Sequence, residues 1–148
     1  TTRNNCGIDP GKMQVIDGSG LSKQNRVTAK AIAELLLKIK DNPMYASIYE
    51  GMPVGGVSGT LQKRFLTTAP HAVGLVRGKT GTLSGTVSLA GYVDSGDRQY
   101  VFVAIADKIP RRYSASERAR DTLDRILGKI AAPIFPELIP VVTPVTTT

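Results

Sequence analysis

The run Gly-Lys-Thr-Gly-Thr at residues 78–82 constrains the fold most, because alternating apolar and β-branched residues lie on both sides of it. This alternation predicts one strand over residues 73–83 and a second over residues 86–94. A third strand is predicted over residues 98–107, after a stretch whose composition, Asp-Ser-Gly-Asp, is typical of a hairpin turn. The chain is therefore expected to contain a three-stranded antiparallel meander.

A helix is expected before these strands. Thr28 has the residue type and position of an N-cap, and Asp-Asn-Pro at residues 41–43 marks the helix end. Between these limits, apolar residues recur at helical spacing at Ile32, Leu35, Leu36 and Ile39. One face of this helix is therefore expected to pack against the sheet.

A second helix is expected after the strands. Ser114 and Glu117 have the spacing of a capping box, which predicts that the helix begins at Ser114. The apolar face of this helix is predicted at i, i+3, i+4 and i+7, namely at Leu123, Ile126, Leu127 and Ile130.

Shorter elements are predicted in the rest of the chain. Residues 13–16 are a candidate short strand, and the Asp-Gly-Ser-Gly stretch at residues 17–20 is typical of a turn. Met44, Ile48 and Tyr49 indicate a short helix. Residues 53–61, which carry three glycines, are expected to form a loop.

The order helix, connection, meander, helix indicates an α/β (α+β) sandwich with an incomplete sheet. Three strands and two helices leave sheet edge and apolar surface uncovered, which is typical of half of a larger sheet. Residues 1–131 are therefore expected to form the folded portion of one domain. Residues 132–148, rich in Pro and Thr, are expected to form an extended tail.

Composition excludes several classes of function. The chain has 148 residues and a net charge of +7, but its basic residues are scattered and its aromatic residues are not interleaved with them. This pattern argues against nucleic-acid binding and suits a surface that works beside an anionic polymer such as a cell envelope. No apolar run approaches the roughly 20 residues of a membrane span, and the polar N-terminus does not have the composition of a signal peptide.

The single cysteine and the single histidine offer little chemistry. Cys6 alone excludes an internal disulfide and a multi-cysteine metal site, so it is either a spare thiol or a bridge to a second chain. His71 lies in the polar stretch Thr-Thr-Ala-Pro-His and is expected to be a surface residue of a loop. We expect no metal site.

The tripeptide Lys79, Thr80 and Gly81 places a cation, a hydroxyl and a residue without a side chain in a row on a predicted edge strand. Such a row can hold a carboxylate and let a substrate backbone lie flat against the strand. A glycine-bearing edge strand without any chemistry remains open on the tripeptide alone. The stretch is not a P-loop, because three residues instead of four separate Gly74 from the Gly-Lys pair and a strand follows it.

Three stretches of the chain together resemble a known family. They are Asp-Gly-Ser-Gly-Leu-Ser-Lys-Gln-Asn at residues 17–25, Gly-Thr-Leu-Gln-Lys-Arg at residues 59–64, and Lys-Thr-Gly-Thr-Leu-Ser-Gly at residues 79–85. In this order and spacing the chain, over about residues 7–110, resembles the C-terminal part of a low-molecular-mass class C penicillin-binding protein. That family comprises D-alanyl-D-alanine carboxypeptidases and endopeptidases, and Lys-Thr-Gly is its third motif.

The resemblance implies a fold and roles for individual residues. The fold would be that of a serine β-lactamase/transpeptidase-like domain, and the reaction would be acyl transfer through a serine ester without a metal or cofactor. Lys79 would assist proton transfer and hold negative charge, while Thr80 and Thr82 would bind the carboxylate of a D-Ala-D-Ala stem or of a β-lactam. The Thr82 N–H would donate to the oxyanion. Gly81 would let the substrate pair with the strand.

The chain departs from the family pattern in two motifs. No lysine has a serine three residues before it, and no Ser-x-Asn occurs, so the nucleophile is expected in an N-terminal portion outside these residues. That portion, peptidoglycan stem peptides and β-lactams are the implied partners, and the implied location is extracytoplasmic. The alternative is a non-catalytic structural or peptidoglycan-binding fragment.

Overall fold

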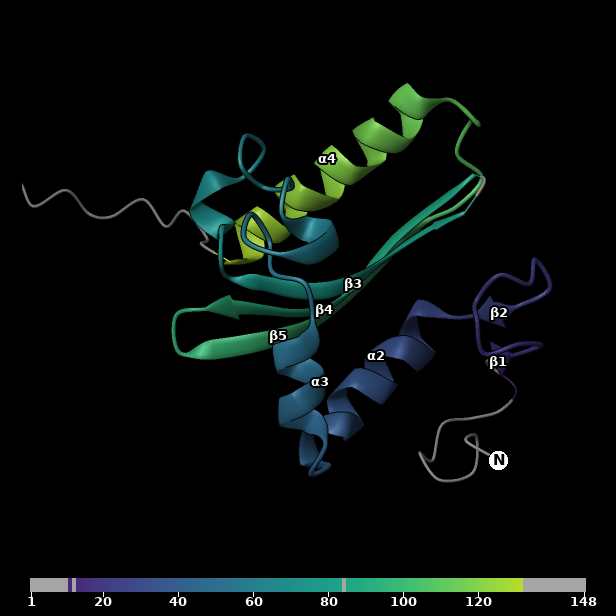
Figure 1. The fold of residues 1–148 in the computed structure, drawn as a ribbon, viewed down its shortest axis with the longest axis horizontal. Helices are drawn as coiled ribbons and strands as arrows, with labels where there is room; N and C mark the ends of the chain where they lie inside the picture. Colours follow the sequence, from purple (N-terminus) through teal and green to yellow (C-terminus); the bar gives the residue numbers. More distant parts are fainter. Residues whose placement is uncertain (1–10, 12, 84, 132–148) are drawn as a thin grey trace, which may run out of the picture.

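The computed structural model describes residues 11, 13–83 and 85–131, with a three-stranded antiparallel sheet at the centre (Figure 1). The strands lie in the order β3-β4-β5, which confirms the meander expected from the sequence. Their bounds are Val76–Leu83 for β3, Thr86–Ser95 for β4 and Arg98–Ala106 for β5. Cys6 and residues 132–148 lie outside the described residues.

Helices cover both faces of the sheet, which gives the expected α/β sandwich (Figure 1). The long helix α4 (Tyr113–Ala131) and the segment between α3 and β3 (residues 52–75, called the loop region) pack on one face. Helices α2 (Ala29–Lys38) and α3 (Tyr45–Gly51) pack on the other. Single-turn 3₁₀ helices lie at Ile39–Asp41, Gly59–Leu61 and Pro70–Ala72. No helix in the described part of the chain has the length and hydrophobicity needed to cross a bilayer.

The face of the sheet toward α4 forms the main core. In the antiparallel register Val76 pairs with Val93, and both side chains are fully buried on this face. The core is completed by residues of the loop region and of α4, mainly Leu61, Phe65, Ala69, Ala72 and Leu127. This face therefore joins three segments that are distant in sequence, and it fixes where α4 crosses β3 and β4.

Three tyrosines hold α3 and α2 on the opposite face. The rings of Tyr45 and Tyr49 each meet the ring of Tyr92 on β4 edge to face, with centroids 5.5 and 5.6 Å apart. The hydroxyl of Tyr92 donates to the C=O of Leu36 at 2.7 Å, which ties the end of α2 to the sheet. Arg77 of β3 lies 4.8 Å from the centroid of the Tyr49 ring.

The prediction that a strand begins at residue 73 is wrong. Gly74 has φ of +83°, in the left-handed region that glycine tolerates, and the Leu75 N–H donates to the C=O of Ala72. This turn follows the 3₁₀ helix Pro70–Ala72, so extended pairing starts only at Val76. The apolar residues Val73 and Leu75 match the pattern of a strand, although the backbone at Gly74 forms a turn.

The first helix and the segment before it agree with the sequence. The Thr28 hydroxyl accepts the Ala31 N–H at 3.1 Å, as expected of an N-cap. Before the helix, β1 (Met13–Gln14) pairs with β2 (Arg26–Val27), a strand that the sequence did not indicate. In the turn between them, the hydrogen bond from Asn25 is the main reason why the pKa of the Asp17 carboxyl is lowered.

The predicted start of the last helix is wrong. Helix α4 already begins at Tyr113, and the N–H groups of Ala115 and Ser116 close its first turn on the C=O of Arg112. Ser114 therefore lies inside the helix and is not its N-cap. Glu117 is left to form an ion pair with Arg120, one turn further along.

The predicted apolar face of α4 is only partly right. Leu127 is buried and Leu123 packs against the core, but Ile126 is 51% exposed and Ile130 is 36% exposed. The face turned to the core instead carries Asp124, Leu127, Gly128 and Ala131. Gly128 permits this orientation, because a Cβ there would lie 2.6 Å from the Cβ of Ala69.

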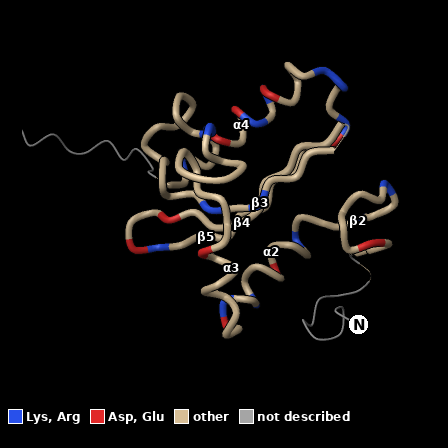
Figure 2. Tube along the Cα trace, in the orientation of Figure 1, with Lys and Arg blue, Asp and Glu red and all other residues tan. Residues whose placement is uncertain are grey.

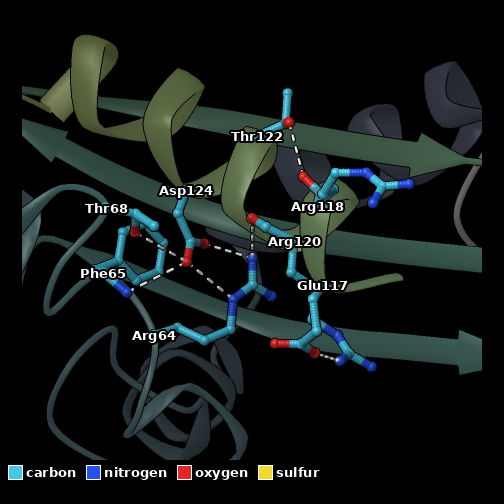
Figure 3. Close-up of polar contacts among 8 residues, drawn as sticks. All are labelled: Arg64, Phe65, Thr68, Glu117, Arg118, Arg120, Thr122 and Asp124. Carbon is cyan, nitrogen blue, oxygen red and sulfur yellow. Dashed lines mark hydrogen bonds and ion pairs between the residues drawn. The ribbon is translucent and has the colours of Figure 1, made fainter. Parts of the chain in front are cut away.

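A buried ion pair fastens the loop region to α4 (Figure 3). Asp124 is 2% exposed, and its carboxylate accepts hydrogen bonds from Nε of Arg64 at 3.2 Å and from Nη2 at 2.5 Å. The same carboxylate accepts the Phe65 N–H at 3.3 Å and the Thr68 hydroxyl at 3.4 Å. These donors compensate the cost of burying the charge.

We expect Asp124→Asn to lower the free energy of unfolding by about 3 kcal/mol, because it leaves the buried Arg64 guanidinium without its counter-charge. Urea unfolding of the purified protein measures this change. Asp121→Asn on the same helix is the matched control and should cost less than about 0.5 kcal/mol. Equal losses in the two variants would contradict the assigned importance of the buried pair.

Tyr92 predicts a dependence of stability on alkaline pH. Burial, with a smaller contribution from Tyr45, raises the pKa of the Tyr92 phenol to about 12. Because the folded state retains this proton more firmly than the unfolded chain, the stabilisation is complete below about pH 10. It is lost as the pH rises from there toward 12. The thermal unfolding midpoint of Tyr92→Phe should fall less steeply over this pH interval than that of the parent protein. The midpoint of Tyr100→Phe should follow that of the parent.

Candidate functional site

The outer edge of β3 is covered over its first half and open over its second. The Gly55 N–H donates to the C=O of Val76 at 2.8 Å, and the Gly78 N–H donates to the C=O of Pro53 at 3.0 Å. Backbone groups of alternate residues in a strand point to the same edge, so those of Thr80 and Thr82 also point outward. Beyond Gly78 no strand of the described part pairs with this edge.

The side chains of the Lys-Thr-Gly-Thr run are divided between the two faces of β3. Thr80 pairs with Leu89 and Thr82 with Val87, and these partners are buried toward α4. Lys79 leaves the strand on the opposite face, since successive side chains alternate. Its exposed side chain turns to the edge, where the ammonium donates to the C=O of Thr80 at 2.6 Å. The structure thus brings Thr80 and Thr82 together and places Lys79 beside them at the edge.

A pocket of about 360 Å³ lies between the loop region, the end of β3 and the first half of α4. We call it the β3–α4 pocket; its lining includes Thr60, Lys63, Thr80, Thr82, Glu117 and Arg120. The Thr80 hydroxyl lies 3.0 Å from the Thr60 hydroxyl, and Nη2 of Arg120 lies 3.5 Å from the Thr82 hydroxyl. Both threonines that the sequence singled out therefore face this pocket.

The charges around the β3–α4 pocket favour an anion. Lys63, Arg64 and Arg120 line it, whereas Glu117 is its one acidic lining residue. Lys and Arg residues are otherwise spread along the chain, apart from a short group in the connection between β5 and α4 (Figure 2). Hydroxyl donors beside cations are suited to a carboxylate.

Gly81 has a structural role in addition to the expected one. A Cβ at this position would lie 2.4 Å from the hydroxyl oxygen of Ser88, its cross-strand partner on β4. Ser88 donates to the C=O of Gly81 at 3.4 Å. Glycine therefore leaves room for this serine between the strands. Whether it also leaves room for a substrate remains a prediction.

The sequence did not indicate a role in the site for three residues of the β3–α4 pocket. Thr60 belongs to the second family stretch but has no role of its own there, Glu117 is predicted in a capping box, and Arg120 has no predicted role. The spacing of Glu117 and Arg120, i and i+3 on a helix, is a signal for an ion pair that could have drawn attention to both. Their approach to β3 depends on contacts between distant segments and has no sequence signature.

His71 lies at the surface as expected, but within the 3₁₀ helix Pro70–Ala72 instead of a loop. His71 is exposed, and its Nε2 lies 3.0 Å from the C=O of Gly128 on α4. A strand, not a helix, follows Lys79 and Thr80, which confirms that the segment is not a P-loop. In the described part of the chain no three His, Cys, Asp or Glu side chains group as a metal site would require.

Curated proteins similar to this chain are carboxypeptidases. Carboxypeptidase DacB of Mycolicibacterium smegmatis is 37% identical over 112 residues, which cover 72% of this chain and 24% of that protein. The D-alanyl-D-alanine carboxypeptidase of Actinomadura is 39% identical over 101 residues, which cover 65% of this chain and 18% of that protein. The chain thus spans about a quarter or less of the length of these relatives.

A solved structure shows the same arrangement of elements. Penicillin binding protein 4 from Haemophilus influenzae superposes with a TM-score of 0.72 at 29% sequence identity, covering 85% of this chain and 29% of that one. The D-Ala-D-Ala carboxypeptidase 3 (S13) family matches residues 2–130. The resemblance inferred from the three sequence stretches is therefore confirmed, and the chain belongs to the D-Ala-D-Ala carboxypeptidase 3 (S13) family.

Proposed function

We propose that this chain is the C-terminal portion of a serine D,D-carboxypeptidase/endopeptidase that acts on D-Ala-D-Ala peptidoglycan stems and is acylated by β-lactams. The observation that carries the proposal is the open edge of β3, where Thr80 and Thr82 face a positively charged pocket and Lys79 lies alongside. Membership in the family supplies the reaction class. Residues 1–131 would belong to the catalytic domain, residues 132–148 would form a tail, and the enzyme would work outside the cytoplasm.

In this proposal an N-terminal portion supplies the nucleophilic serine with its lysine and the Ser-x-Asn motif. The serine oxygen attacks the carbonyl carbon of the penultimate D-Ala, and the terminal residue leaves as an amine that takes up a proton. Water then hydrolyses the serine ester, so the enzyme is regenerated. The outward-facing N–H of Thr82 would donate to the oxyanion that forms in each step.

Lys79 and the two threonines would have different roles. The ammonium of Lys79 would stabilise negative charge and assist proton transfer near the serine. The hydroxyls of Thr80 and Thr82 would hold the substrate carboxylate, since both lie on the face lined by cations. Pairing of the substrate backbone with the open edge would align the scissile bond between these groups.

The second sheet edge supports the need for an N-terminal portion. β5 pairs with β4 and with no other strand of the described part, and Tyr100 and Ile105 on it are 42% and 39% exposed. An edge and apolar surface of this kind would be covered by further strands of the same enzyme. The contact would be core-like and larger than the roughly 1,600 Å² of an ordinary interface.

The competing function is a non-catalytic fragment that binds peptidoglycan or serves as structure. Labelling with a fluorescent penicillin separates the two. A protein that joins this chain to its N-terminal portion should give a covalent band, while the chain alone should give none because it lacks Ser-x-x-Lys. A joined protein that takes up no label and releases no D-Ala would favour the fragment.

We expect Lys79→Ala in the joined enzyme to slow acylation by penicillin at least about a hundredfold, because it removes a preorganised positive charge from the site. The exposed position of Lys79 means that folding should survive, as a thermal unfolding midpoint near that of the parent would verify. Lys129→Ala on α4 provides a matched control and should label at the parent rate. Near-parent labelling of Lys79→Ala would remove this lysine from the mechanism.

We expect Thr82→Val to weaken kcat/KM for an acid-terminated D-Ala-D-Ala peptide by the equivalent of about 1.5–3 kcal/mol, because it removes a hydrogen bond to a charged group. The substitution keeps the backbone N–H and the approximate shape of the side chain. The same peptide with an amidated C-terminus lacks the charge and should lose much less. Equal losses on both peptides would show that Thr82 does not recognise the carboxylate.

A further inference from the structure

Arg120 occupies a distinct position in the β3–α4 pocket. It lies in the first half of α4, and its Nη2 atom is 3.5 Å from the hydroxyl oxygen of Thr82, at the long end of hydrogen-bond distances. The two residues are 38 positions apart in the sequence. No other guanidinium in the described part of the chain has a hydrogen bond to either threonine of the run.

The direction of this hydrogen bond has a chemical consequence. A guanidinium can only donate, whereas a hydroxyl has one proton to donate and two lone pairs to accept with. When Arg120 donates to Thr82, the proton of the Thr82 hydroxyl points elsewhere and is free for an acceptor. Thr80 differs, because its neighbour Thr60 is itself a hydroxyl and can take or give the proton.

Arg120 is held at two points, one on its guanidinium and one on its backbone (Figure 3). Its side chain forms an ion pair with Glu117, one turn earlier on the same helix. Its backbone C=O accepts a hydrogen bond from Nη2 of Arg64 at 3.1 Å, and Arg64 is fixed by the buried Asp124. Both contacts reduce the freedom of Arg120 before any ligand arrives, which lowers the entropy cost of recognition.

We propose that Arg120 is a positioning residue that orients the Thr82 hydroxyl as a donor to the C-terminal carboxylate of the substrate. The proposal rests on the function proposed above and concerns the same site. In this proposal α4 contributes to the selectivity of the site for ligands that end in a carboxylate. The ion pair with Glu117 holds the Arg120 guanidinium against the end of β3.

The test uses the joined enzyme and the acid-terminated and amide-terminated peptides. Arg120→Gln should lower kcat/KM for the acid about tenfold, mainly through KM, and should change the value for the amide less than twofold. Arg120→Lys keeps the charge but not the planar fork, so it should recover part of the loss. Glu117→Gln should shift the preference in the same direction by a smaller factor.

Arg118→Gln is the matched control. It makes the same change in charge on the same helix, but Arg118 does not line the β3–α4 pocket, and its side chain extends in a different direction from that of Arg120 (Figure 3). This variant should keep the parent preference for the acid. If it loses as much preference as Arg120→Gln, the effect is one of general charge and the proposal fails.

A double-mutant cycle decides between positioning and direct contact with the carboxylate. If Arg120 acts through Thr82, then Arg120→Gln added to Thr82→Val should reduce kcat/KM for the acid less than twofold further. Multiplying losses would mean that Arg120 acts independently and would overturn the proposal. An equal loss on acid and amide in Arg120→Gln would do the same, since a purely structural role predicts it.

The outcome for the parent enzyme keeps the two proposals apart. A parent that neither hydrolyses D-Ala-D-Ala nor takes up penicillin overturns the proposed function, and this inference with it. A parent that hydrolyses the acid and whose Arg120→Gln variant keeps the full preference overturns this inference alone. The thermal unfolding midpoint of each variant shows whether a loss of kcat/KM comes from misfolding. If Arg120→Gln misfolds, Arg120→Lys is compared with the parent enzyme in its place.

Discussion

The buried carboxylate of Asp124 is the interaction on which the rest of the site depends. It lies on α4 and accepts hydrogen bonds from Arg64, Phe65 and Thr68, so it fixes the loop region against the helix. That loop carries Thr60 to the hydroxyl of Thr80, and Arg64 in turn holds the backbone of Arg120. A charge buried for structural reasons thereby sets the geometry of the polar groups beside the open strand. Well-packed apolar residues could replace both Arg64 and Asp124 without loss of stability, but they would not hold the backbone of Arg120 in place.

Close approach between elements is the second constraint, and glycines permit it. Gly78 and Gly91 are cross-strand partners, and a Cβ on Gly91 would lie 2.1 Å from the C=O of Arg77. Gly128 lets α4 lie against the loop at Ala69, which turns Leu127 inward and leaves Ile126 exposed. The loop near Gly55 pairs with the first half of β3 only, and its hydrogen bonds stop at Gly78, directly before the Lys-Thr-Gly run.

The errors in prediction have specific physical causes. The capping box predicted at Ser114 does not form because α4 already begins at Tyr113, and Glu117 pairs with Arg120 instead. A helix start is decided by backbone geometry as much as by residue type. The apolar face predicted on α4 was only partly right because a polar residue, Asp124, occupies a core position that the spacing rule reserves for apolar side chains. A buried charge can be recognised only when its partner is known, and here the partner lies 60 residues earlier.

The sequence by itself determined the three strands, the two longer helices and the Lys-Thr-Gly run. Through the three family stretches it also determined that the chain belongs to the D-Ala-D-Ala carboxypeptidase 3 (S13) family. These features are local, since periodicity and short motifs act within a few residues. Only the tertiary structure decided which side of β3 each residue of the run occupies relative to α4, that the outer edge opens after Gly78, and that Arg120 reaches Thr82. Such relations arise when distant segments pack on one sheet, and no local pattern specifies which side chains then meet.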